Sequence, residues 1–192
     1  MDLSVELTRL VLRRGSRKVV GLPLHLNLLG SVKALPVSYL LGRFKKIYLE
    51  DDRFREVAEA LCPECVARSV EGVTIVDRAL IVEAYYNTIA QEVLALAPGI
   101  DSIAVPCFTG ALGEAVSRRA REAEPGLTVV AAKLGDGFCG WADVVYEGLS
   151  PPPLPRALRI GPASSATISA ALRAQDERSL FSTVALLTDW RP

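Results

Sequence analysis

Hydrophobic and polar positions follow one another along the chain in blocks that predict an α/β protein. Short, continuous apolar runs are typical of buried strands, and apolar residues at helical spacing indicate amphipathic helices. The expected strands are Lys18–Leu22, Lys46–Leu49, Val73–Val76, Ile103–Val105, Thr128–Ala132, Asp143–Tyr146 and Thr183–Leu187. The expected helices are Leu3–Arg14, Ala34–Leu41, Arg53–Leu61, Ile81–Leu96, Glu114–Ala123 and Ser164–Arg173. Asp51-Asp52 is expected to cap the helix Arg53–Leu61. This alternation favours a mainly parallel sheet with helices on both faces.

The length of 192 residues fits a single α/β domain. Residues 1–80 are a candidate for a reduced small lobe within it. The proline-rich segment Leu149–Pro155 is the clear linker, because three consecutive prolines exclude a helix or a central strand.

Charge and composition narrow the classes of partner. The formal net charge is +0 and no long basic run is present, so we expect neither nucleic acid nor a membrane surface as a partner. A small-molecule ligand and further copies of the chain, in a homo-oligomer, are the expected partners. The N-terminus lacks the order of a signal peptide and no apolar stretch reaches a membrane span of about 20 residues, so we expect a cytoplasmic protein. Arginine outnumbers lysine and methionine occurs once, which favours a heat-adapted source, although a GC-rich genome would give a similar bias.

The segment Asp101–Ala115 predicts an anion-binding turn. An apolar strand leads into the small-residue stretch Cys107–Gly113, and a helix follows. Unpaired backbone N–H groups at a helix N-terminus attract phosphate. The alternative is an ordinary strand-to-helix turn, because neither a Walker motif nor GxGxxG is present.

The cysteines leave several interpretations open. Cys62-Pro-Glu-Cys65 is compatible with a disulfide, a redox pair or half of a zinc site. Because a closed zinc site needs four ligands and no second CxxC is present, we expect a structural or disulfide role and no metal. Cys107 is expected to be a small buried residue. His25 is the single histidine, so it is the sole candidate for the histidine of a Ser-His-Asp system.

Six segments resemble, in order, motifs of the fold type II pyridoxal-phosphate enzymes, the group of threonine synthase, cysteine synthase and tryptophan synthase β. The segments are Asn27-Leu-Leu-Gly-Ser-Val-Lys33, similar to N-P-x-G-S-(V/F)-K; Lys45–Leu61, similar to the strand and helix that end the small domain; Tyr85–Val93, similar to GQKTIAYEI; Asp101–Leu112, similar to the phosphate-loop motif D-x-(V/I)-V-V-P-x-G-x-G-G-x-L; Pro162–Leu172; and Ala185–Asp189. The resemblance implies the same fold and pyridoxal phosphate as the cofactor.

The resemblance also implies site residues. Lys33 would form the Schiff base with the cofactor, and its apolar neighbours would lower the pKa of its amine if it is buried. The implied cofactor-binding residues are Asn27, the phosphate-loop residues Thr109, Gly110, Ala111, Leu112 and Gly113, and Ser164 or Ser165, with Thr188 as the alternative, at the pyridine nitrogen. The competing interpretations are a solvated surface lysine for Lys33 and a helix N-cap for Ser164-Ser165.

The chain also departs from the family pattern. Members of the family are larger, Ala34 and Leu35 replace the Asp and Arg that follow the family lysine, and the phosphate loop has fewer glycines. The substrate-binding S-G-N-x-(G/A) loop has no counterpart. An alternative register places the residues from Leu149 to Gly161 on another family segment and leaves Ser164 and Ser165 without a role.

These departures leave two functional hypotheses and a third class. The first is a reduced pyridoxal-phosphate enzyme that catalyses elimination or replacement on a small hydroxy-amino acid. The second is a non-catalytic descendant that binds a phosphate or another metabolite as a homo-oligomer. The missing substrate loop favours the second, and the Gly30-Ser-Val-Lys33 motif favours the first. We expect a protein that keeps the fold without the full activity. An unrelated α/β phosphate-binding protein is the third class.

Overall fold

The computed structural model describes residues 2–6, 9–24, 31–96, 98–154 and 160–189. Within these residues, a seven-stranded sheet has the strand order β1-β2-β3-β9-β6-β7-β8. Its strands are β1 (Asp2–Glu6), β2 (Arg9–Arg14), β3 (Arg17–Pro23), β6 (Ser102–Cys107), β7 (Thr128–Lys133), β8 (Val144–Tyr146) and β9 (Ser182–Leu187). Neighbours from β3 to β8 are parallel, and β1 to β3 form an antiparallel meander. The mainly parallel α/β sheet predicted from the sequence is therefore confirmed.

The N-terminal helix predicted for Leu3–Arg14 is wrong, because this segment forms β1 and β2. Strand β2 pairs with β3 through the two-residue turn Gly15-Ser16, and Gly15 has a left-handed φ of 61°. A short apolar run is compatible with either periodicity, so pairing with β3 decides its structure.

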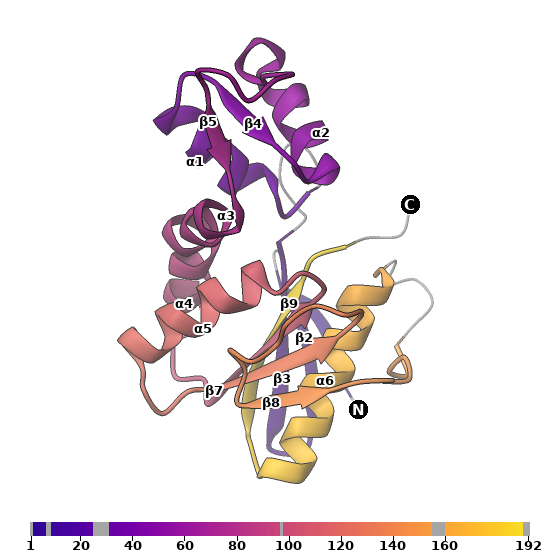
Figure 1. Cartoon of the computed structure of the whole chain (residues 1–192). Helices are drawn as coiled ribbons and strands as arrows, with labels where there is room; N and C mark the ends of the chain where they lie inside the picture. Colours follow the sequence, from indigo (N-terminus) through magenta and orange to yellow (C-terminus); the bar gives the residue numbers. More distant parts are fainter. Residues whose placement is uncertain (1, 7–8, 25–30, 97, 155–159, 190–192) are drawn as a thin grey trace.

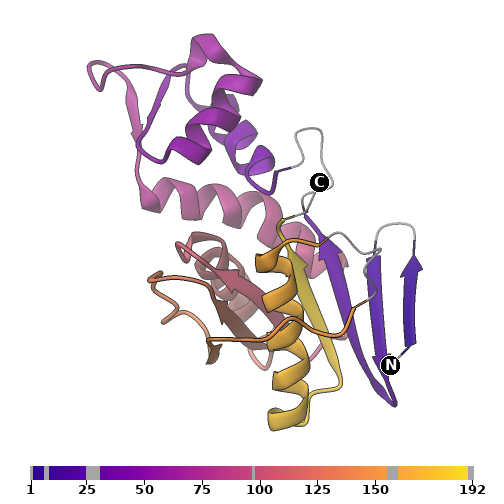
Figure 2. The same ribbon diagram turned by 90° about the vertical axis from the view of Figure 1, so that its right-hand side faces the viewer.

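Strands β6, β7 and β9 are buried on both faces. Ile103 and Val105 contact one core cluster, and Ala104 between them contacts the other. Helix α6 (Pro162–Arg178) covers the second face, where alanines line both the strands and the helix. Helix α5 (Ala111–Ala123) packs on the opposite face (Figures 1 and 2). Helices on both faces explain why these strands are continuous apolar runs in the sequence.

Residues 34–76 form a smaller α/β unit above the carboxyl edge of the large sheet (Figure 1). It contains α1 (Ala34–Arg43), β4 (Ile47–Leu49), α2 (Asp52–Leu61), the short helix η1 (Pro63–Cys65) and β5 (Thr74–Val76). Strands β4 and β5 pair in parallel. Asp51 caps α2 by accepting a hydrogen bond from the Arg53 N–H at 2.9 Å, the capping role that the sequence predicts for Asp51-Asp52.

A long helical segment joins the smaller unit to the large sheet. It consists of α3 (Arg78–Tyr85), a π-helical turn η2 (Tyr86–Ala90) and α4 (Gln91–Leu96). Its buried residues, among them Val82, Ile89 and Val93, belong to the core cluster that continues under α5. No helix in the described part of the chain combines the length and apolar character needed to cross a membrane.

Candidate ligand-binding pocket

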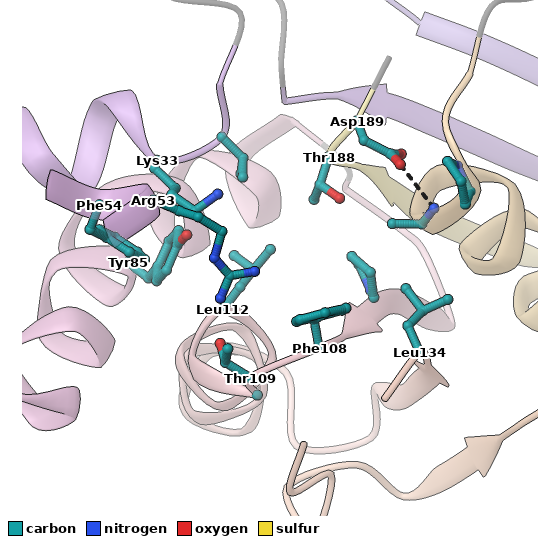
Figure 3. Close-up of a pocket in the computed structure, with 15 residues that line it drawn as sticks. Lys33, Arg53, Phe54, Tyr85, Phe108, Thr109, Leu112, Leu134, Thr188 and Asp189 are labelled. Carbon is teal, nitrogen blue, oxygen red and sulfur yellow. Dashed lines mark hydrogen bonds between the residues drawn. The ribbon is translucent and has the colours of Figure 1, made fainter. Parts of the chain in front are cut away.

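A pocket of about 450 Å³ lies between the carboxyl edge of the large sheet and the smaller unit (Figure 3). The loops after β6, β7 and β9 form one side, and the starts of α1 and α2 with the end of α3 form the other. Its lining residues are Val32, Lys33, Arg53, Phe54, Tyr85, Pro106, Phe108, Thr109, Gly110, Leu112, Leu134, Pro162, Ala163, Thr188 and Asp189. Ligands of parallel α/β sheets bind at this carboxyl edge, so the pocket is the main site candidate.

Lys33 is the residue before α1, and its amine lies in the pocket (Figure 3). The amine lies 5.8 Å from the centre of the Phe54 ring, and no carboxylate of the described residues forms an ion pair with it. Burial lowers the pKa of the Lys33 amine, and the nearby positive charge of Arg53 lowers it further. Asp51 and Glu56 oppose this shift in pKa without reversing it. The pocket therefore shifts the Lys33 amine towards its neutral, nucleophilic form.

An aromatic wall stands beside Lys33. The rings of Phe54 and Tyr85 pack edge to face with their centres 6.0 Å apart. Burial raises the pKa of the Tyr85 hydroxyl, so this group stays neutral at physiological pH. The wall gives the pocket an apolar surface that suits a planar ring.

The segment Thr109–Gly113 lies at the pocket, and its structure differs in part from the prediction. Helix α5 begins at Ala111 and not at Glu114, because Gly110 takes a left-handed φ of 85° and ends the loop there. Leu112 and Gly113 therefore belong to the first turn. No side chain caps this helix, and none of the described groups accepts a hydrogen bond from the amides of Ala111 to Gly113. These amides form an open helix N-terminus beside the pocket.

Close backbone packing holds this loop against the segment that follows β7. A Cβ atom at Gly137 would lie 1.9 Å from the Phe108 carbonyl oxygen, and one at Gly110 would lie 2.4 Å from the Phe138 carbonyl oxygen. A Cβ atom at Gly113 would lie 1.9 Å from the Trp141 ring. The two candidate phosphate-loop glycines therefore have a packing role that the sequence did not reveal.

Both cysteine pairs form disulfides. Cys62 and Cys65 are joined, in agreement with the structural interpretation of this motif. Cys107 is buried as expected, but it is joined to Cys139, a pairing that the sequence did not predict. This second bond connects the start of the phosphate-loop segment to the loop after β7, residues that are 32 positions apart.

Asp189 closes the N-terminus of α6, the second helix start at the pocket. Its carboxylate accepts hydrogen bonds from the N–H groups of Ala163 at 3.0 Å and Ser164 at 2.7 Å. The Ser164 hydroxyl donates to the Asp189 carbonyl at 2.9 Å and accepts from the Asp189 N–H at 3.2 Å. The N-cap role expected for Ser164-Ser165 is wrong, since α6 begins at Pro162 and the carboxylate of Asp189 provides the cap.

The three candidates for contact with a ring nitrogen are placed differently. Thr188 lines the pocket, on another wall from Lys33 (Figure 3). Ser164 is buried with its hydroxyl engaged by the Asp189 backbone, and Ser165 lies outside the lining residues. Asn27 lies outside the described residues. The structure thus brings Lys33, the α5 start and Thr188 to one pocket.

Replacement of Asp189 by alanine is expected to lower the free energy of unfolding by about 2 kcal/mol, because two N–H groups of α6 lose their acceptor. Urea denaturation measures the change. Asp176→Ala is the control, since Asp176 pairs with Arg14 and Arg17 at the surface and is expected to cost less than about 1 kcal/mol. Equal losses in the two variants would contradict the capping role.

Sequence reasoning missed Arg53, Tyr85 and Asp189 as pocket residues. Arg53 had a detectable signal, because it follows the predicted cap Asp51-Asp52 at the carboxyl end of a strand. Tyr85 and Asp189 had none, since their positions depend on how α3 and β9 meet the rest of the fold.

No protein-family model matches the chain, and no curated protein matches it by sequence. Solved structures do resemble it. The threonine deaminase of T.th. superimposes with a TM-score of 0.68 and 14% identity, over 92% of this chain and 86% of that chain. A lysine-to-alanine mutant of O-ureido-L-serine synthase with bound O-ureido-L-serine superimposes with a TM-score of 0.68 and 14% identity, over 95% of this chain and 86% of that chain. O-ureido-L-serine synthase itself superimposes with a TM-score of 0.66 and 16% identity, over 94% of this chain and 87% of that chain.

These structures are fold type II pyridoxal-phosphate enzymes, and the chain has their fold. The resemblance inferred from short sequence motifs is thereby confirmed at the level of the fold. At such low identity the likeness concerns the fold alone, and any chemistry depends on the residues of the pocket.

Proposed function

We propose that the pocket binds pyridoxal phosphate. One observation carries the proposal: a primary amine with a lowered pKa, an open helix N-terminus and the hydroxyl-bearing Thr188 come from distant parts of the chain and line the same pocket. Lys33 would hold the aldehyde carbon covalently. The backbone N–H groups at the start of α5, with the Thr109 hydroxyl, would donate to the phosphate. Thr188 would face the ring nitrogen.

The pocket fits such a ligand in size and polarity. Its volume of about 450 Å³ is within the range of small-molecule sites. Apolar side chains, including Val32, Leu112 and the Phe54–Tyr85 pair, provide surfaces for a planar ring between the polar groups. The N-termini of α2 and α6 are already closed by Asp51 and Asp189, so among these three helix starts α5 remains for the phosphate.

The proposed reaction class is elimination or replacement on a small hydroxy-amino acid. The names of the structural neighbours refer to threonine and to a serine derivative, which both carry oxygen at the β carbon. When bound, the cofactor would supply an electron sink for such chemistry. A neutral hydroxyl at Thr188, rather than a carboxylate, would leave the ring less electron-deficient, which favours elimination or replacement over transamination. The Lys33 amine would accept and return a proton near the substrate carbon.

Binding without turnover is the second candidate function. The observation that favours it is the closed start of α2, where the Asp51 carboxylate already accepts the Arg53 N–H and leaves no free amide at that position. The chain also lacks a sequence counterpart of the family's substrate loop. In this case the pocket would retain the cofactor or another phosphorylated metabolite.

A comparison of pyridoxal phosphate with pyridoxal tests the proposal. After equilibration and dialysis, the visible absorption band of the lysine-bound cofactor should persist with pyridoxal phosphate. Pyridoxal should bind about 100-fold more weakly, because the charge-assisted hydrogen bonds to phosphate are missing. Equal retention of the two compounds would exclude the α5 phosphate site. Retention without the band would favour an anion-binding protein that does not use Lys33, and no retention would refute the proposal.

A further inference from the structure

Arg53 is a cation in the pocket that makes none of the proposed contacts to the cofactor. It is the second residue of α2. In the pocket, its guanidinium lies 5.2 Å from the centre of the Phe108 ring (Figure 3). The ring contact stabilises the cation and restricts the plane of the guanidinium. About half of the side chain is exposed, with a relative exposure of 49%, so a ligand can reach it.

Part of the guanidinium is already engaged. The Nε atom lies 3.4 Å from Asp51 Oδ1, and Nη2 lies 3.1 Å from Asp51 Oδ2. The Nη1 atom has no hydrogen-bond partner among the described residues. An arginine carries five N–H donors, so the edge formed by Nη1 and Nη2 keeps donors for another acceptor. Asp51 thus orients Arg53 without using up its capacity.

The charge around this edge favours an anion. Lys33 lies close enough for the positive charge of Arg53 to lower the pKa of its amine, although Asp51 and Glu56 act in the opposite direction. Among the described residues, Arg53 forms an ion pair with Asp51 alone and Lys33 forms none. The carboxylate of Asp189 is held by the amides of α6 on another wall. Arginine stays charged at all relevant pH values, so a ligand anion would be attracted even when Lys33 is neutral.

The shape of the group selects among anions. A guanidinium edge presents two parallel N–H donors that match the two oxygens of a carboxylate. In the proposed function, the N–H groups at the open start of α5 already bind the phosphate. We propose that Arg53 binds the carboxylate of the amino acid that enters the pocket. This inference rests on the proposed function for the identity of the reacting ligand.

Chemical protection tests Arg53 directly and needs no cofactor. Phenylglyoxal modifies accessible arginines, and peptide mass spectrometry measures the modified fraction at Arg53. L-serine should protect Arg53, whereas L-serinamide, which lacks the carboxylate, should not. Inorganic phosphate should protect it less than L-serine does. Protection by phosphate with none by L-serine would overturn the inference and would make Arg53 a phosphate contact.

A binding experiment on the cofactor-loaded protein gives a second readout. Arg53→Gln should weaken L-serine binding, followed by the change in the visible spectrum, by about 10- to 100-fold, because a bidentate charged contact is lost. The affinity of Arg53→Lys for L-serine should lie between that of the parent and that of Arg53→Gln. Arg53→Lys keeps the positive charge beside Lys33 and should retain pyridoxal phosphate as the parent does. Arg68→Gln is the matched control, since Arg68 is an exposed arginine of the same unit outside this pocket.

The outcomes separate the two proposals. If the parent protein fails to retain pyridoxal phosphate, the proposed function fails, while the protection experiment still decides the role of Arg53. If Arg53→Gln retains the cofactor but binds L-serine as the parent does, the inference about Arg53 is wrong and the proposed function stands. Loss of cofactor retention in Arg53→Lys, which keeps the charge, with a native circular dichroism spectrum, would also overturn the inference.

Discussion

Replacement of Lys33 by methionine is expected to abolish the visible band of bound pyridoxal phosphate and to reduce covalent labelling at this site to background. Methionine keeps the apolar stem that packs near Phe54 and removes the nucleophilic nitrogen. Borohydride reduction of the parent complex followed by peptide mapping should place the label on Lys33. Lys45→Met is the control, because Lys45 is exposed and outside the pocket.

The pH dependence of this labelling tests whether the lowered pKa of Lys33 is the reason for its reactivity. Burial and the charge of Arg53 lower the pKa of Lys33 from 10.5, so the amine loses its proton at a lower pH than an ordinary lysine does. Labelling should therefore rise with pH through a midpoint below 10.5. A midpoint at or above that value, or a band that survives in Lys33→Met, would remove Lys33 from the mechanism.

Removal of the Cys107–Cys139 disulfide is expected to have the second largest effect. Because the two cysteines lie 32 positions apart, loop-closure entropy gives a loss of about 4 kcal/mol in the free energy of unfolding when both residues are changed to serine. For a chain of this length we expect the midpoint of thermal unfolding to fall by roughly 8–16 °C. Affinity for inorganic phosphate should also fall, because the bond holds the start of the loop that leads to α5.

The other disulfide provides the matched control. Cys62 and Cys65 are three positions apart, and their removal should cost only about 2 kcal/mol by the same reasoning. It should leave phosphate binding unchanged, because this bond lies outside the pocket. Equal losses of stability and of phosphate affinity in the two double variants would show that the Cys107–Cys139 bond has no special role at the pocket.

Much of the fold could be predicted because each element carries a local signal. Ile103–Val105 and Thr183–Leu187 are buried runs of mostly apolar residues, which is typical of strands covered on both faces. Asp51 before α2 is a recognisable cap. The segment from Leu3 to Arg14 misled the helix prediction because its spacing fits two periods and only its pairing with β3 separates them.

Part of the pocket could also be predicted, but the assignment of hydroxyl groups could not. Thr109 and Lys33 belong to motifs that can be recognised in the sequence, and both line the pocket. Ser164 and Thr188 carry the same functional group in equally plausible contexts. Asp189 distinguishes them, because its backbone engages Ser164 while Thr188 faces the cavity.

The sequence by itself determined the strands from β3 to β9, most of the helices, the lysine candidate and the loop that starts α5, because periodicity, caps and turns are properties of neighbouring residues. The tertiary structure decided which distant groups meet. It joined Cys107 to Cys139, closed α6 with Asp189 and brought Arg53 into the same pocket as Lys33. These contacts depend on how the smaller unit and the sheet edge come together, and no local pattern encodes that arrangement.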